Sequence, residues 1–203
     1  MLKYIRTTWL HAILVILAIF LDGGLAQQFS GVLFKMPMSA SPYLSILAIL
    51  MPILSGTDSQ IGNRWLYGTA VLGGVLFDTF YVGIIGIATV GFPLVVWVAG
   101  VIQRYFQTSM SWSMLTWFLS MCIFLIYDYF AFGLINLANM NLFGFIVFHL
   151  FPTIVLNLIF FIVLYTPFTY LYQMTKQPDI SSYNTDQRDF NSGIPLRTRS
   201  RNY

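Results

Sequence analysis

A nearly uncharged stretch between residues 65 and 102 most constrains what this chain can fold into. Its 38 residues contain a single charged side chain, Asp78. A bilayer core about 30 Å thick is crossed by roughly 20 apolar residues in a helix, and 38 helical residues would extend almost twice as far. We therefore predict two transmembrane helices here. They turn back in residues 78–83, where a charge, β-branched residues and a glycine interrupt the apolar pattern.

The composition favours a membrane protein over a soluble one. Hydrophobic residues make up 58% of the chain, charged residues 8%, and the mean hydropathy is +0.75. A soluble domain of 203 residues with this composition would have too few polar side chains to cover its surface. Cys122 is the one cysteine, so we expect neither a disulfide nor a cysteine-based metal site. We also expect no cofactor and no nucleic acid partner.

The apolar runs predict an all-α, polytopic membrane protein with six transmembrane helices. We place these helices at residues 7–27, 42–55, 65–80, 83–103, 112–136 and 143–172, and the second is long enough to span only if it is counted from residue 36. The first run is also compatible with a cleaved signal peptide, since Gly24 and Ala26 are small residues that suit a cleavage site. We favour a retained helix because the apolar segments that follow are also predicted to lie in the membrane. The second helix is interrupted by Pro37, Pro42 and Pro52.

The chain divides into a membrane domain, residues 1–173, and a polar tail, residues 174–203. The tail is rich in Gln, Asn, Ser, Thr, Asp and Arg, so it cannot bury enough apolar surface to offset the entropy of ordering. We predict that it is flexible and cytoplasmic.

The positions of lysine and arginine predict that both termini lie in the cytoplasm. Short cytoplasmic loops and the flanks of transmembrane helices carry an excess of these residues. With six helices and both ends inside, nine of the ten lysines and arginines fall on the cytoplasmic side, and Lys35 alone falls outside. An even number of crossings is therefore favoured.

Three aspartates lie in the outer half of the membrane in this topology. Asp22, Asp78 and Asp128 each come late in a helix that runs outward. A charged side chain inside a bilayer usually faces a wet cavity or finds a partner. Asp22 and Asp78 are close enough to helix ends to be hydrated at the interface instead, and that alternative stays open. We expect Asp128, which lies deeper, to have a structural or functional partner.

A polar stripe on the last predicted helix lies at the same depth. His149, Thr153 and Asn157 recur at a spacing of four, so they share one helix face. Pro152 has no N–H and frees the carbonyl of Phe148 from its helical hydrogen bond. We expect this stripe to meet at least one of the three aspartates and to form a buried polar cluster with them.

Small residues predict where helices approach closely. Ala70, Gly74 and Asp78 recur at a spacing of four on the third predicted helix, and Gly83 and Gly86 follow. Small side chains let helix backbones come together in a membrane. We therefore predict that Ala70, Gly74, Gly83 and Gly86 pack against a partner helix.

Nothing in the sequence predicts a catalytic or metal site. No serine has the flanking glycines of a nucleophile elbow. The two histidines, His11 and His149, cannot form a zinc-binding pair at a spacing of four. We expect no enzymatic activity.

Several motifs together resemble the MreD family of bacterial rod shape-determining proteins. They are Tyr67-Gly68, Gly73-Gly74-x-x-x-Asp78, Asp128 within Tyr-Asp-Tyr-Phe-Ala-Phe-Gly, and Phe151-Pro152-Thr153-Ile154-Val155-Leu156-Asn157 followed by Pro167-Phe168. The most specific part is the Pro-Thr-x-x-x-Asn block with its downstream proline, which implies structural roles for Pro152 and Pro167. The resemblance covers roughly residues 9–176.

The resemblance implies a non-enzymatic scaffold of the cell-elongation complex in the bacterial cytoplasmic membrane. The expected partners are MreC directly and, in the same complex, MreB, a SEDS glycosyltransferase and a class B penicillin-binding protein, which act in lateral peptidoglycan synthesis. The implied fold is similar to the substrate-binding subunits of energy-coupling-factor transporters. The alternative function is such a subunit, holding a small, vitamin-type solute in the outer polar cluster. Ala12, Ala18 and Ala26 lack the spacing of four that those subunits tend to carry on their first helix, which favours the scaffold.

Overall fold

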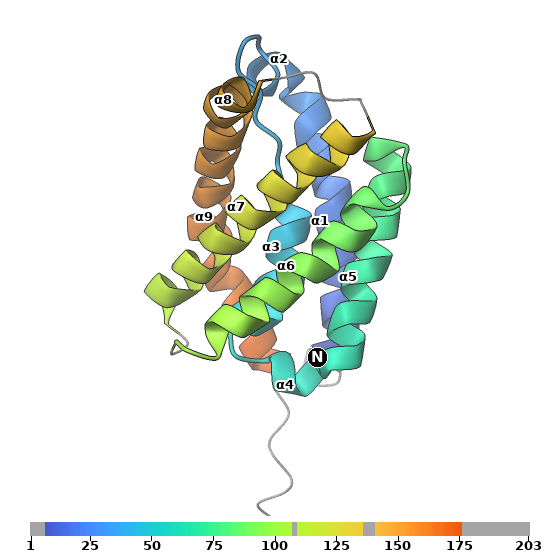
Figure 1. Cartoon of the computed structure of the whole chain (residues 1–203). Helices are drawn as coiled ribbons and strands as arrows, with labels where there is room; N and C mark the ends of the chain where they lie inside the picture. The colour runs from blue at the N-terminus through green and yellow to red at the C-terminus, as the bar shows by residue number, and fades with distance from the viewer. Residues whose placement is uncertain (1–6, 107–108, 136–140, 176–203) are drawn as a thin grey trace, which may run out of the picture.

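The computed structural model describes residues 7–106, 109–135 and 141–175, and all its regular elements in these ranges are helical. The long helices are α1 (Thr7–Gln28), α3 (Leu44–Leu54), α5 (Asn63–Phe77), α6 (Ile87–Gln103), α7 (Met110–Leu134) and α9 (Phe151–Thr175). Three single turns are α2 (Ser30–Leu33), α4 (Asp58–Ile61) and α8 (Leu142–Phe145). Two π-helical turns, η2 (Asp78–Val82) and η3 (Ile146–Leu150), extend α5 and lead into α9. Figure 1 shows them arranged as one bundle, and the predicted all-α class is confirmed for these residues.

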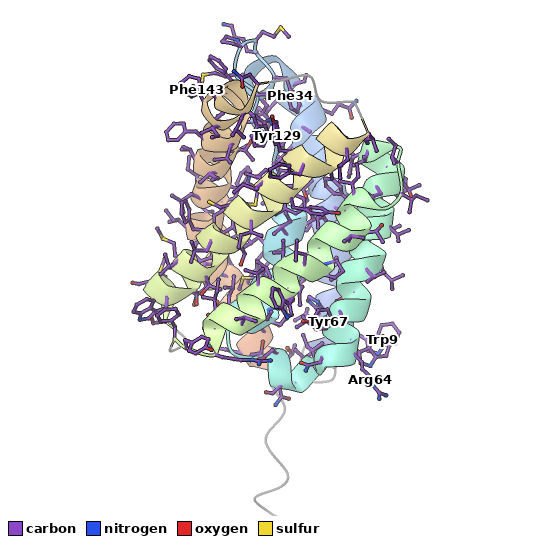
Figure 2. The ribbon with its side chains drawn as sticks, in the orientation of Figure 1. Trp9, Phe34, Arg64, Tyr67, Tyr129 and Phe143 are labelled. Carbon is purple, nitrogen blue, oxygen red and sulfur yellow. The ribbon has the colours of Figure 1, made fainter. Side chains whose placement is uncertain are left out.

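Four helical stretches in the described ranges are long and apolar enough to cross a membrane. They are Thr7–Gln28, Asn63–Val82, Met110–Leu134 and Leu142–Thr175. The two other long helices are shorter, with 17 residues in α6 and 11 in α3. The chain is thus a membrane protein, and six crossings remain a prediction. Figure 2 shows Trp9, Arg64 and Tyr67 near one end of the bundle and Phe34, Tyr129 and Phe143 near the other.

The short helix α3 lies at the centre of the bundle. All 11 of its residues are buried, and α1, α5, α6, α7 and α9 all contact it, as its central place in Figure 1 shows. Its sequence is apolar on nearly every side, which is typical of an enclosed helix. At about 1.5 Å per residue, α3 is roughly 16 Å long, about half the bilayer core. Because protein surrounds it instead of lipid, its length need not match the membrane.

The turn predicted at residues 78–83 lies later in the chain. The helix continues through η2, whose last residue is followed by Gly83 with a positive φ of 75°. The Gly83 N–H donates to the Asp78 carbonyl at 2.7 Å, and glycine takes up this left-handed conformation without steric cost. The turn therefore runs from Gly83 to Gly86, whose φ is 130°, and α6 begins at Ile87 rather than at residue 83.

Two other boundaries also differ from the prediction. The second helix begins at Leu44, two residues after the shorter predicted start at residue 42 and eight after the longer one at residue 36. Proline disfavours the helical conformation for the residue before it, and residues 38–43 have no regular secondary structure. The last helix continues to Thr175, two residues into the segment predicted to be a polar tail. The remainder of that tail, residues 176–203, lies outside the described residues.

The small-residue face of α5 packs inside the chain. Ala70 is fully buried, and a Cβ added at Gly74 would lie 2.5 Å from the Ala88 carbonyl oxygen and from the Thr89 Cα. The close approach is therefore made by α6 of the same chain. Gly83 and Gly86 lie in the turn between the two helices. In the structure, Ala70 and Gly74 thus pack against α6 of the same chain rather than a partner helix, whereas packing of a partner helix at Gly83 and Gly86 stays a prediction.

We predict that Gly74→Ala destabilises the protein, because the added methyl group would collide with the α6 backbone. Overpacking of this kind costs about 1–3 kcal/mol, and thermal unfolding in detergent would measure it. Gly68→Ala is the matched control on the same helix, since a Cβ there meets nothing within 4 Å. Equal melting temperatures for the two variants would contradict the close approach of α5 and α6.

Candidate functional site

The inner part of the polar stripe binds the backbone that leads into α3. Asn157 Oδ1 accepts a hydrogen bond from the Tyr43 N–H at 2.7 Å, and its Nδ2 donates to the Ser41 carbonyl at 2.7 Å. Thr153 Oγ1 accepts from the Ser41 N–H at 3.2 Å. Both stripe side chains are buried. They therefore supply partners to backbone groups that no helix or sheet satisfies.

At the other end of the stripe, His149 and the neighbouring Phe148 carbonyl bind an earlier residue of the same segment, Ser39. Ser39 Oγ and His149 Nδ1 lie 2.8 Å apart, within hydrogen-bond distance. The Ser39 N–H donates to the carbonyl of Phe148 at 2.8 Å. Pro152 has no N–H to offer that carbonyl, so the carbonyl is free to bind the segment. Pro167 lies further along, inside α9.

Asp22 approaches the start of α3 from α1. Its two carboxylate oxygens accept hydrogen bonds from the Leu44 N–H at 2.6 Å and the Ser45 N–H at 2.9 Å. A carboxylate at a helix N-terminus satisfies free N–H groups and interacts favourably with the helix dipole. The stripe therefore binds residues 39–43 and Asp22 binds the next two residues. The stripe and Asp22 thus bind neighbouring parts of one backbone segment, rather than each other as predicted.

Asp78 does the same for α6. Its oxygens accept from the backbone N–H groups of Gly86, Ala88 and Thr89 at 2.8 to 2.9 Å, and from the Thr89 hydroxyl at 2.8 Å. Asp78 is 0% exposed and Asp22 is also buried. The alternative in which these two side chains are hydrated at the interface is therefore wrong, because both are buried and bind the N–H groups at helix N-termini.

Asp128 differs from the other two aspartates. It makes no hydrogen bond within the described part of the chain. It lines a cavity of about 260 Å³ together with Asp22. Aromatic side chains supply much of the wall, namely Phe34, Tyr43, Phe77, Tyr81 and Phe132. A carboxylate beside aromatic faces suits a small organic cation, which both would attract.

A buried histidine that the sequence analysis considered only as a zinc ligand joins three helices. His11 Nδ1 lies 2.8 Å from the Tyr172 hydroxyl, and its Nε2 lies 2.8 Å from Thr69 Oγ1. Thr69 in turn donates to the carbonyls of the preceding turn of α5. These contacts link α1, α5 and α9. The available signal was a lone ionisable residue inside a predicted span, which seldom faces lipid.

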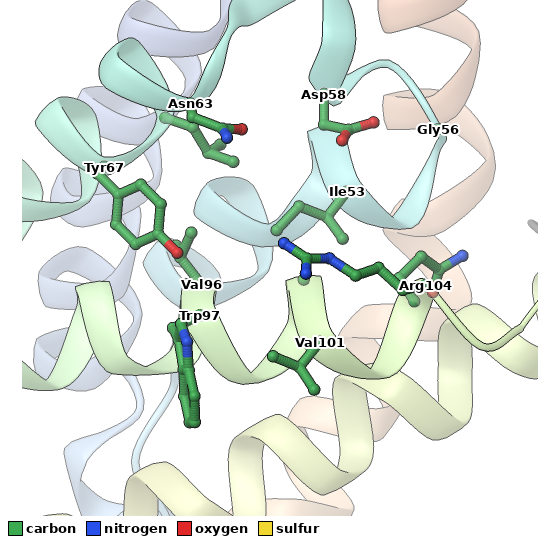
Figure 3. A pocket seen from close by; sticks show the side chains of 12 residues that line it. Ile53, Gly56, Asp58, Asn63, Tyr67, Val96, Trp97, Val101 and Arg104 are labelled. Carbon is green, nitrogen blue, oxygen red and sulfur yellow. The ribbon is translucent and has the colours of Figure 1, made fainter.

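A second cavity, of about 390 Å³, lies at the end of the bundle that carries α4 (Figure 3). Asp58 and Arg104 both line it, from α4 and from the residue after α6. From the sequence alone, Arg104 served only as one of the nine lysines and arginines that predict the orientation of the chain. Among the described residues, no three His, Cys, Asp or Glu side chains gather to hold a metal ion.

The comparison with known families agrees with the motifs quoted from the sequence. The family model described as rod shape-determining protein MreD matches residues 5–175, a range that contains every described helix and both cavities. No curated protein and no solved structure matches the chain.

We predict that Asp22→Asn destabilises the fold by about 1–3 kcal/mol, because it removes a charge-assisted hydrogen bond and turns an amide donor toward the N–H groups of α3. Asp128→Asn is the control, and we expect it to change stability by less than about 0.5 kcal/mol, since Asp128 makes no hydrogen bond. Reversible unfolding in mixed micelles would compare them. A control as damaging as Asp22→Asn would contradict the capping role.

Proposed function

Because this chain belongs to the MreD family of rod shape-determining proteins, we propose that it is a membrane scaffold of the bacterial cell-elongation complex. In this role it binds MreC and helps maintain rod shape during lateral peptidoglycan synthesis, beside MreB, a SEDS glycosyltransferase and a class B penicillin-binding protein. MreD is not a known enzyme family. In the proposed role, the protein therefore acts by docking partners and catalyses no reaction.

The use of the buried polar groups supports a scaffold. Asp22, Asp78 and Asn157 each bind backbone groups of the same chain. Side chains held in this way make a rigid bundle and are not free to act as an acid, a base or a nucleophile. The arrangement fits a protein whose task is to present a fixed surface within the membrane.

We place the docking surface for the MreC transmembrane helix at a groove between α1 and α5. The groove encloses about 200 Å³ and is almost entirely apolar. Its lining comes from two of the four candidate spans, with Ala12, Val15 and Ile16 on α1 and Thr69, Leu72, Gly73, Val75 and Leu76 on α5. Small residues such as Ala12 let a second helix approach closely in a membrane. This groove takes the place of the buried face at Ala70 and Gly74.

We also propose that the chain crosses the cytoplasmic membrane six times and keeps both ends in the cytoplasm. Residues 39–43, which the polar stripe binds, and the 11 residues of α3 span at most roughly 33 Å together, enough for the bilayer core. Irregular backbone is tolerated at this depth where protein encloses it. The Thr7 hydroxyl donates to the Thr175 carbonyl at 3.0 Å. The start of α1 and the end of α9 therefore lie together, which supports an even number of crossings.

The test is to fill the groove. We expect Ala12→Phe to reduce recovery of MreC with the purified protein by about tenfold, the effect of roughly 1.4 kcal/mol of misfit. In cells depleted of the native chain, this variant should leave rounded cells where the wild type restores rods. Ile13→Phe is the matched control, because Ile13 is 56% exposed on the same helix and lies outside the groove.

The docking groove and the scaffold function can fail separately. If Ala12→Phe binds MreC and restores rods as well as Ile13→Phe does, the groove is not the docking surface. If the wild-type chain does not recover MreC and depletion leaves cell shape unchanged, the scaffold function itself fails.

The Asp128 cavity favours a second candidate function, that of a small-solute subunit. Its unpaired carboxylate and aromatic wall predict a cationic solute. In this case a small organic cation should copurify at one equivalent, as measured by native mass spectrometry, and Asp128→Asn should lose it. A chain that carries no such cation, with altered cell shape on depletion, would leave the scaffold as the function.

A further inference from the structure

We propose that the cavity beside α4 binds a phospholipid headgroup that contains both a phosphate ester and a primary ammonium group. The cavity lies among the end of α3, the single turn α4, the start of α5 and the end of α6 (Figure 3). Its two charged side chains have opposite signs. This inference rests on that cavity alone and does not depend on the scaffold function.

The two charged side chains of the cavity do not form an ion pair with each other. Asp58 and Arg104 both line the space, yet neither side chain has an ion-pair or hydrogen-bond partner in the described ranges of the chain. Figure 3 shows the Arg104 guanidinium extending between Ile53 and Val101, with Asp58 on another wall. A bound group that carries a negative and a positive charge would satisfy both. Guanidinium groups bind phosphate oxygens with paired N–H donors, and a carboxylate accepts from an ammonium group.

A second donor in the same cavity also lacks an acceptor. Gln103 lines the space, and its Oε1 accepts from the Thr116 hydroxyl at 3.1 Å. Its Nε2 is buried and has no hydrogen-bond partner among the described residues. A buried donor without an acceptor is costly, and a phosphate oxygen held by the neighbouring Arg104 would provide one.

The surroundings of the cavity fit the depth of a lipid headgroup. Tyr67 and Trp97 line it, and Trp97 is 57% exposed. Tyrosine and tryptophan are enriched where a membrane meets water, and Figure 2 shows Tyr67 at the same end of the bundle as Trp9 and Arg64. The exposed Trp97 and the half-buried Val101 extend the apolar surface along α6. The headgroup would therefore sit among polar groups while its acyl chains follow an apolar helix surface.

This arrangement selects among common phospholipids. Phosphatidylethanolamine offers a phosphate to Arg104 and an N–H donor to Asp58. Phosphatidylcholine has a quaternary ammonium without N–H groups, so it cannot donate to the carboxylate. Phosphatidylglycerol has neutral hydroxyl donors in place of the ammonium group, so no positive charge in its headgroup offsets the repulsion between its phosphate and the Asp58 carboxylate.

The experiment is to purify the full chain from nanodiscs that contain equal amounts of these three lipids and to quantify the retained lipid by mass spectrometry. The wild type should retain phosphatidylethanolamine about tenfold over the other two, the effect of one charge-assisted hydrogen bond. Arg104→Gln should lose this lipid to the level of bulk exchange. Asp58→Asn should remove the preference and raise the share of phosphatidylglycerol.

Asp128→Asn is the matched control, because it removes a carboxylate from the other cavity, and it should leave the lipid order unchanged. Adding free phosphoethanolamine distinguishes two sources of the same headgroup chemistry. Displacement of the lipid would assign the site to a soluble ligand, and resistance would assign it to the membrane. Equal retention of all three lipids by the wild type, or an unchanged order in both cavity variants, would overturn the proposal.

Discussion

The need of the polypeptide backbone for hydrogen bonds inside a membrane governs this structure. Residues 38–43 have no helical or sheet partners, and they enter the middle of the bundle. Lipid could not satisfy their N–H and C=O groups. Thr153 and Asn157 bind them from α9, and Asp22 binds the first N–H groups of α3 from α1. Without these contacts the central helix could not begin where it does.

The remaining polar groups divide according to whether the backbone uses them. Asp78 binds the N-terminus of α6 as Asp22 binds that of α3, and the two aspartates thus hold both short helices in place. Asp128, Asp58 and Arg104 have no such task, and each lines a cavity. The sites proposed for a solute and a lipid are therefore lined by charged groups that the backbone does not use, whereas the groove proposed for MreC is apolar.

Several parts of the fold could be predicted because they depend on local composition. The long apolar runs predicted most helix ends within a few residues. The second helix begins two residues after Pro42, at Leu44. The π-helical turn η2 could not be predicted from local composition, and its first residue, Asp78, binds the N-terminus of a helix that begins nine residues later. The face of Ala70 and Gly74 was expected to pack closely, and it does, but against α6 of the same chain.

The sequence by itself determined that the chain is helical, that it belongs in a membrane and that a few polar residues share faces, because hydrophobicity and helical spacing are properties of neighbouring residues. Only the tertiary structure decided which groups those faces meet. His11 shows the difference, since its partners Thr69 and Tyr172 lie 58 and 161 residues away. Spacing along a helix says which side chains point the same way, whereas the identity of the opposing surface depends on how all the helices pack at once.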